Sequence, residues 1–235
     1  MSLKAISIDE IGKWEKRIPR SCVVNRDELI LELCRNRSVL HIGAVDSPFH
    51  MEKAARGDLL HQKVRAVAAS VKGIDADRDA IAWLKAHHGI DDIEEVDLDS
   101  ITAPYSRSDQ KHYDVVLCCD ILEHVMNFSS VMSYCRSHMD IQTLLVITTI
   151  NATSAKVAAR ALFDREAVHP DHVCYFSYGT ICALIRKQGL VPIKFGVFCY
   201  STVTAMSKLF FGILARVAPG SADGLFLISK IPEGK

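Results

Sequence analysis

A chain of 235 residues is long enough to bury a full hydrophobic core and suits one α/β domain. Its composition, 49% hydrophobic and 24% charged, excludes a wholly disordered or fibrous protein. Lysine and arginine total 28, as do aspartate and glutamate, so the net charge of zero gives no electrostatic reason to expect a nucleic-acid partner.

The first segment, residues 1–37, is predicted to form an N-terminal helical cap, because apolar residues within 29–34 repeat on one helical face. Charged residues at positions 4, 9 and 10 argue against a secretory signal. The eight cysteines lie mostly in apolar runs and form no CxxC pair, which favours free thiols over disulfides or a cysteine zinc site. We therefore expect a cytoplasmic protein.

Four short apolar runs come next, each followed by polar residues or glycine. These runs are mostly uninterrupted rather than alternating, which is typical of strands buried on both faces of a parallel sheet. Helical patterns alternate with them, which predicts βαβ units and a doubly wound sheet. The predicted strands are 38–42, 70–74, 113–118 and 143–148, and the predicted helices are 51–67, 78–88, 128–139, 154–163 and 178–187.

Two final strands, 190–200 and 224–231, predict an antiparallel hairpin at one sheet edge. Between them an apolar helical insertion is expected near 203–218, too interrupted by charge to span a bilayer. Its apolar face favours packing on the domain or a partner, with membrane-surface or lipid contact as the alternative. Residues 38–235 are therefore predicted to form one α/β domain around a mostly parallel seven-stranded sheet.

Acidic residues follow the ends of four predicted strands. Asp46 lies in the turn that starts at Gly43, and Asp75 ends the second strand. Asp97 follows a weaker third strand, which lies before the run 113–118, and Asp120 follows that run as the fourth strand. The carboxyl ends of parallel strands form the ligand-binding edge, so these acids suit a ligand with hydroxyl and amino groups. Asp75 stands where an acid accepts both hydroxyls of a ribose. Capping of the following helix is its structural alternative.

Seven segments in order resemble the successive motifs of class I S-adenosylmethionine (SAM)-dependent methyltransferases. The pattern is most similar to the small-molecule and glycan-type branch, which has a Leu-Glu-His segment after the fourth strand. The resemblance implies a Rossmann-like methyltransferase fold with SAM at the carboxyl edge of the sheet. The segments are Val39–Gly43, Val71–Asp75, Val96–Leu98, Tyr113–Leu117, Asp120–Val125, Leu145–Asn151 and His172–Ser177.

The resemblance implies a set of residues that bind SAM. Gly43 and its neighbours form the turn below the methionine part, Asp75 holds the ribose, and Asp97 receives the adenine amino group. Ala76 and the Leu98 backbone flank the adenine, and the end of the fourth strand lies near the methionine end. The full predicted set is His41, Gly43, Ala44, Asp46, Asp75, Ala76, Asp97, Leu98, Cys119 and Asp120.

The first motif departs from the family's pattern. Where the family has an acid and then two or three glycines, this chain has His41, a single Gly43 and then Ala44. Asp46 is a candidate replacement for the acid. A degenerate methyltransferase-like scaffold is the alternative function. A nicotinamide-dependent dehydrogenase is a third hypothesis, against which the missing G-x-G-x-x-G turn counts.

Two histidines are candidate catalytic residues. A hydroxyl acceptor usually needs a general base, and histidine titrates near neutral pH. His124 follows the fourth strand, and His172 lies in a segment that resembles the family's substrate side. A structural role is the alternative for each. His169 and His172 form a pair without a third ligand nearby in the sequence, so no metal site is predicted.

The sequence thus predicts a SAM-dependent methyltransferase with a small-molecule acceptor. The resemblance favours a sugar or lipid-linked glycan hydroxyl. No nucleic-acid partner is expected, and the sequence leaves the oligomeric state open.

Overall fold

The strands form one eight-stranded sheet in the order β1-β7-β8-β6-β5-β2-β3-β4, and the predicted α/β, mostly parallel fold is confirmed. The strand order reverses beside β2 (Ser38–Ile42), which has β3 (Ser70–Asp75) on one side and β5 (Val115–Cys119) on the other. In doubly wound sheets such a reversal marks the ligand-binding crevice. The computed structural model describes residues 3–21, 25–100, 111–200, 213 and 217–233.

The eighth strand is the difference from the seven predicted. β1 (Lys4–Ala5) pairs antiparallel with β7 (Val191–Phe198), and both of its residues are exposed, so no apolar pattern marks it in the sequence. The predicted N-terminal helix is likewise shorter than expected. Helices there cover Ile8–Ile11 (α1) and Arg26–Cys34 (α2). The prediction that residues 1–37 are helical was therefore wrong at Lys4–Ala5, which form β1.

The chain divides into two compact units by the contacts among its residues. Unit 1 comprises Met1–Arg26, Leu122–Val125 and Ile147–Lys235. Unit 2 comprises Asp27–Ile121 and Met126–Val146.

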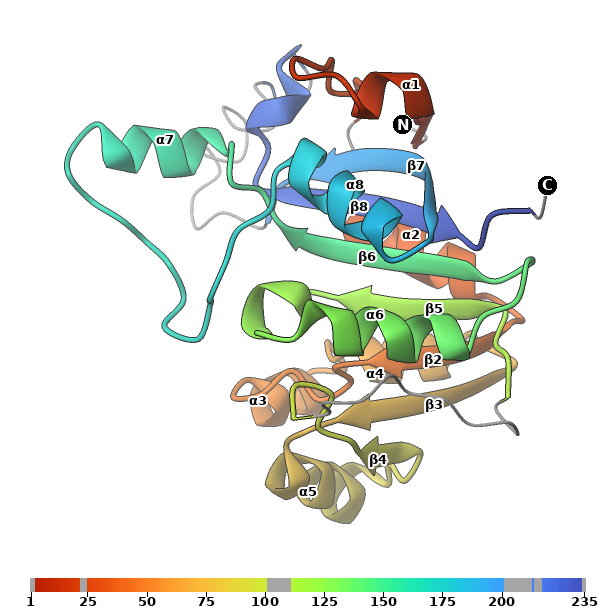
Figure 1. Ribbon diagram of the computed structural model, residues 1–235. Helices are drawn as coiled ribbons and strands as arrows, with labels where there is room; N and C mark the ends of the chain where they lie inside the picture. Colours follow the sequence, from red (N-terminus) through yellow and green to blue (C-terminus); the bar gives the residue numbers. More distant parts are fainter. Residues whose placement is uncertain (1–2, 22–24, 101–110, 201–212, 214–216, 234–235) are drawn as a thin grey trace. The chain divides into compact units, whose positions relative to one another are not determined.

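Unit 2 holds the parallel strands β2, β3, β5 and β4 (Ile93–Glu95). Ile42 is aligned with Ile74 of β3 and with Cys118 of β5, and Asp75 is aligned with Glu95 of β4. The arrowheads of β2, β3 and β5 point the same way in Figure 1. The carboxyl ends of these strands therefore meet at one edge, as the sequence predicts.

The helices of unit 2 follow local signals in the chain. α5 (Arg78–His88) begins where the Asp77 side chain accepts the Ala80 N–H, and it ends at Gly89 in the left-handed conformation. The predicted helix 51–67 is instead two helices, α3 (His50–Ala55) and α4 (Leu60–Arg65), because Gly57 adopts a φ of +69° between them. The remaining helix, α6, covers Phe128–Ser137. One cluster of buried apolar residues in this unit comprises Ala44, Val45, Ala54, Leu59, Ala80, Leu84, Ile90 and Ile93.

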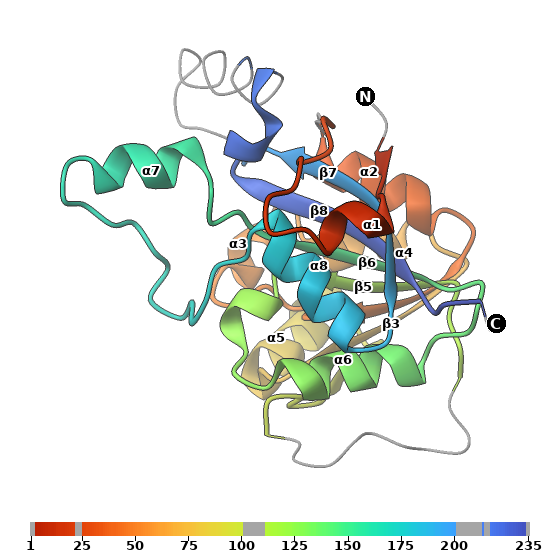
Figure 2. The same cartoon turned by 45° about the horizontal axis from the view of Figure 1, so that its top comes forward.

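Unit 1 is built on β7 and β8 (Gly224–Lys230), whose antiparallel pairing confirms the predicted C-terminal hairpin. α8 (Tyr178–Lys187) packs on them, with the Tyr178 and Phe195 rings 4.6 Å apart between centroids. α7 (Ala155–Ala161) and the segment after it loop outward from β7 and β8 in both views (Figures 1 and 2). β6 (Leu144–Ile150) contributes residues to both units.

The predicted apolar helix at 203–218 lies outside the described residues, apart from positions 213, 217 and 218. Within the part that is described, no helix combines the length and apolar character needed to cross a membrane. The cysteines of that part are all free thiols, as predicted. Burial raises the pKa of the Cys34 and Cys182 thiols to about 12, so neither is a nucleophile at neutral pH.

Candidate functional site

The turn after β2 requires glycine at its first position. Gly43 has a φ of +73°, and a Cβ atom there would lie 1.8 Å from Cδ1 of Ile121. The N–H groups of Gly43 and Ala44 both donate to the Ile74 carbonyl, at 2.9 and 3.2 Å. These bonds hold the turn against the end of β3. The backbone at Gly43 therefore lies so close to Ile121 that a side chain at this position would overlap it.

Asp75 is bonded to the same turn. Its Oδ2 accepts the Val45 N–H at 2.9 Å, and its Oδ1 accepts the Asp77 N–H at 3.1 Å. A carboxylate offers about four lone-pair sites, so both oxygens can accept a further hydrogen bond. Burial raises the pKa of Asp75 despite these bonds to backbone N–H groups. The carboxylate is thus held in one orientation and is suited to two ribose hydroxyls.

Two further acids at this edge have left-handed backbone conformations, which are uncommon outside glycine. Asp46 has a φ of +63° and Asp120 a φ of +55°. The Asp46 carboxylate pairs with the Lys53 ammonium, and both side chains are about two-fifths exposed. An ammonium group of a ligand would therefore share Asp46 with Lys53. Such backbone conformations cluster at ligand sites, where surrounding structure maintains them.

The loop after β4 is organised by two carboxylates. Oδ1 of Asp97 accepts the N–H groups of Asp99 and Ser100, and the Ser100 hydroxyl bonds to Oδ2. These hydrogen bonds, the hydroxyl first, hold the pKa of Asp97 below its usual range. Asp99, which is not in the predicted set, accepts the N–H groups of Met126 and Asn127 at 3.0 and 2.6 Å. It ties this loop to the start of α6.

His41 lies in the interior rather than at the edge. Its imidazole is 2% exposed, and its Nδ1 is 3.3 Å from Nδ1 of His61. His61 in turn reaches Asp92, with 3.2 Å between Nε2 and Oδ1. Any contribution of His41 to ligand binding therefore passes through the backbone of the turn. Of the other predicted residues, Ala44, Leu98 and Cys119 are buried and Ala76 is exposed.

The order of the strands sets the order of these groups along the edge. β4, β3, β2 and β5 are consecutive in the sheet, so Asp97, Asp75, the Gly43 turn and Asp120 follow one another. Three strand spacings cover about 14 Å. Adenine, ribose and methionine have this same order in SAM, so the residues present fit the cofactor that the sequence implied.

Three histidines lie together in unit 1. His124 ends the short helix η1 (Leu122–His124), and its ring centroid is 4.5 Å from that of His172 and 5.8 Å from that of His169. One ring nitrogen from each histidine lies within 4.8 Å of the other two. The structure thus brings together both predicted catalytic residues and adds His169, for which the sequence offered only the His-x-x-His spacing.

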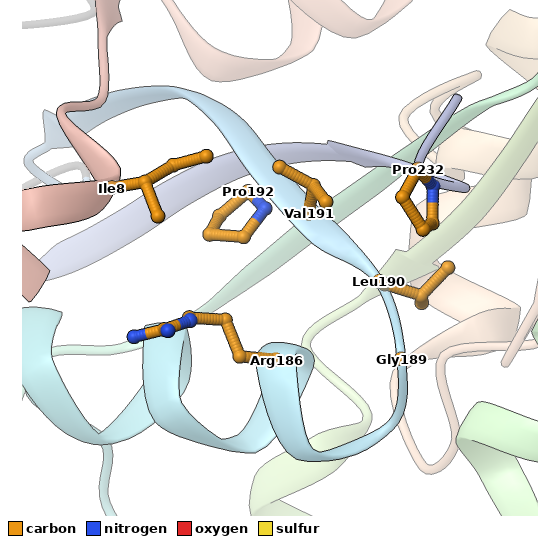
Figure 3. A pocket seen from close by; sticks show the side chains of 7 residues that line it. All are labelled: Ile8, Arg186, Gly189, Leu190, Val191, Pro192 and Pro232. Atoms are coloured by element: carbon orange, nitrogen blue, oxygen red, sulfur yellow. The ribbon is translucent and has the colours of Figure 1, made fainter. Parts of the chain in front are cut away.

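A cavity of about 310 Å³ also occurs in unit 1. Figure 3 shows that Arg186 comes from α8 and that the remaining lining is apolar. None of its residues belongs to the predicted cofactor-binding or catalytic sets. The lining residues are Ile8, Arg186, Gly189, Leu190, Val191, Pro192 and Pro232.

The fold is that of class I SAM-dependent methyltransferases. The profile of a methyltransferase-domain family matches residues 15–194, and the chain belongs to this family, whose cofactor is SAM. A ubiquinone biosynthesis O-methyltransferase from Glaesserella parasuis is 26% identical over 102 residues, which cover 42% of this chain and 43% of that protein. One from Sinorhizobium fredii is 30% identical over 112 residues, 48% of this chain and 44% of the relative. These matches span less than half of each relative's length.

Solved structures share the fold. A SAM-dependent methyltransferase from Mesorhizobium loti has a TM-score of 0.55 at 15% identity, covering 87% of this chain and 95% of that chain. Magnesium protoporphyrin IX methyltransferase from Synechocystis PCC 6803, solved with bound SAH, has a TM-score of 0.54 at 14% identity. That alignment covers 88% of this chain and 82% of the other.

Proposed function

We propose that the protein transfers the methyl group of SAM to a hydroxyl oxygen of a small-molecule acceptor. The observation that carries the proposal is the order of Asp97, Asp75, the Gly43 turn and Asp120 along one sheet edge, which matches the order of adenine, ribose and methionine. Oxygen is favoured as the acceptor atom because the curated relatives are named O-methyltransferases.

The proposed roles at the edge follow from the donors and acceptors present. Asp75 accepts hydrogen bonds from the ribose hydroxyls, and Asp97 accepts one from the adenine amino group. Asp46 and Asp120 supply negative charge toward the methionine ammonium. Ala76 and Leu98 flank the adenine, while Ala44 and the Cys119 backbone support the methionine side. SAM supplies an electrophilic methyl group on a positively charged sulfur.

The acceptor hydroxyl must lose its proton as the new oxygen–carbon bond forms. We assign this proton to a ring nitrogen of His124 or His172, which lie next to each other in unit 1. His124 follows Asp120 by four residues in the chain. Holding the nucleophile in line with the methyl group supplies much of the remaining rate enhancement.

Two acceptor classes follow from different observations. The resemblance of the Leu-Glu-His segment favours a sugar or lipid-linked glycan hydroxyl. The names of the curated relatives favour an acceptor of the kind methylated in ubiquinone biosynthesis. Incubation with methyl-labelled SAM and a panel from both classes separates them by which product carries the label.

Replacing His124 or His172 with glutamine should lower kcat by about 10²–10⁴-fold, because the acceptor proton loses its base. Turnover with labelled SAM measures the loss, and calorimetry should show unchanged SAM affinity. His112→Gln is the control, since His112 is exposed and outside the cluster. Full turnover in both cluster variants would remove the base assignment. SAM binding without transfer to any acceptor would favour a scaffold function.

A further inference from the structure

We infer that His124, His169 and His172 form a binding site for a transition-metal ion, with Zn²⁺ as the ion that fits best. One ring nitrogen from each lies within 4.8 Å of the other two. Tetrahedral zinc with Zn–N bonds of 2.0–2.1 Å needs about 3.3 Å between its nitrogen ligands. Small ring rotations therefore bring the three nitrogens to bonding distance.

The donor set selects the class of metal. Neutral imidazole suits Zn²⁺ and other late first-row ions, whereas Mg²⁺ and Ca²⁺ prefer oxygen ligands. Three histidines with a fourth position open is an arrangement found in zinc sites that keep a water or a substrate group. His124 is exposed and the other two histidines are half-buried, so solvent reaches the cluster.

The backbone holds the ligands together without help from an ion. His169 and His172 are the ends of a turn closed by the His172 N–H on the His169 carbonyl at 3.0 Å, with Pro170 at the position where proline favours turns. The Val173 N–H donates to the Glu123 carbonyl at 2.8 Å. This bond joins the residue after His172 to the residue before His124, so the two segments cannot separate freely.

The carboxylate of Asp171 lies near one of the proposed ligands, His169. Oδ2 of Asp171 is 3.7 Å from Nδ1 of His169. In this conformation Nδ1 of His169 accepts the Asp171 N–H at 3.3 Å. Turning the ring away from that N–H would let a protonated Nδ1 donate to the carboxylate, which leaves the Nε2 lone pair for the metal. Carboxylates that fix metal-bound histidines in this way are common around protein zinc sites. The Glu123 side chain, 1% exposed and bonded to the Thr149 hydroxyl at 2.8 Å, anchors the other segment.

The metal site goes beyond the proposed function and does not depend on it, since SAM binds to other residues. With zinc bound, the three imidazoles are ligands, and the base role proposed above belongs to the zinc-free protein. His169 separates the two ideas, because it is a proposed ligand and not a proposed base.

The test is Zn²⁺ titration of the full chain against a chromophoric chelator, with Co²⁺ as the spectroscopic probe. The wild type should bind about one ion per chain, and Co²⁺ should show the visible bands of a tetrahedral nitrogen site without thiolate charge transfer. His169→Gln should lower Zn²⁺ affinity by about 100-fold or more, as loss of a ligand does. His112→Gln should bind as the wild type does.

Zinc affinity that is absent in the wild type, or equal in the wild type and His169→Gln, would overturn the site. His172→Gln provides a second ligand variant. Circular dichroism and SAM calorimetry on each variant show that the fold is retained. In the ligand variants, loss of zinc binding with unchanged SAM affinity supports the site. A wild-type protein that binds SAM but not zinc overturns the site and leaves the proposed methyl transfer standing.

Discussion

Replacing Asp75 with alanine should weaken SAM binding by about 10²–10⁴-fold, because two charge-assisted hydrogen bonds worth about 1.5–3 kcal/mol each are lost. The carboxylate is held by the Val45 and Asp77 N–H groups, so it meets the ribose without reorganising. Calorimetric titration with SAM measures the effect. Asp91→Ala is the matched control, since it removes an exposed carboxylate that precedes β4 and pairs with Arg65.

The pH dependence of stability in an Asp75 variant independently checks that this carboxylate is buried. Its folded-state pKa is raised by burial, so the protonated form is favoured in the folded protein. That stabilisation is fully present below the unfolded pKa of about 3.9 and is lost as pH rises through the folded pKa. Relative to Asp75→Asn, which does not titrate, the wild-type Tm should fall as pH rises above about 4 and through the raised folded-state pKa. A difference in Tm that does not change with pH would contradict the burial of this charge.

For the binding experiment, unchanged SAM affinity in Asp75→Ala would remove Asp75 from the cofactor site.

Replacing Gly43 with alanine should destabilise the fold by about 2–5 kcal/mol and reduce SAM binding. The left-handed backbone accounts for about 1–2 kcal/mol of this and the overlap with Ile121 for about 1–3 kcal/mol. The new Cβ would lie 1.8 Å from Cδ1 of Ile121, so either the turn or that side chain must move. Urea denaturation measures the stability, and calorimetry measures the affinity.

Two further variants separate the backbone strain at Gly43 from the overlap with Ile121. Gly57 has a similar φ of +69° but nothing within 4 Å of an added Cβ, so Gly57→Ala measures the backbone strain alone. Adding Ile121→Ala to Gly43→Ala removes the overlap and should restore part of the SAM affinity. If Gly43→Ala destabilises no more than Gly57→Ala, the close approach to Ile121 has no energetic consequence.

Much of the fold follows from local patterns in the chain. β2 and the helix Arg78–His88 were predicted with the bounds that the structure has. The strand was marked by a mostly apolar run, and the helix by a helical pattern. In the structure a capping aspartate and a terminal glycine bound that helix. The alternation of such elements was enough to predict a doubly wound sheet. The acids that end its strands were then expected at one edge, and the strand register confirms that position.

Other features depended on contacts between distant parts of the chain. Lys4–Ala5 is a strand only because β7 offers an edge to pair with. Asp99 was not among the predicted site residues, because its binding to the N–H groups at the start of α6 is not visible in the sequence.

The contrast between what the sequence determines and what the tertiary structure decides is clearest at the two proposed sites. The sequence by itself determined which residues end each parallel strand, since strand periodicity and turn residues are local properties. Parallel pairing then places those ends side by side, so the cofactor edge could be predicted. The three-histidine cluster was decided by the tertiary structure alone. His124 meets His169 and His172 through one turn and one backbone hydrogen bond, and no periodicity in the chain relates segments so far apart.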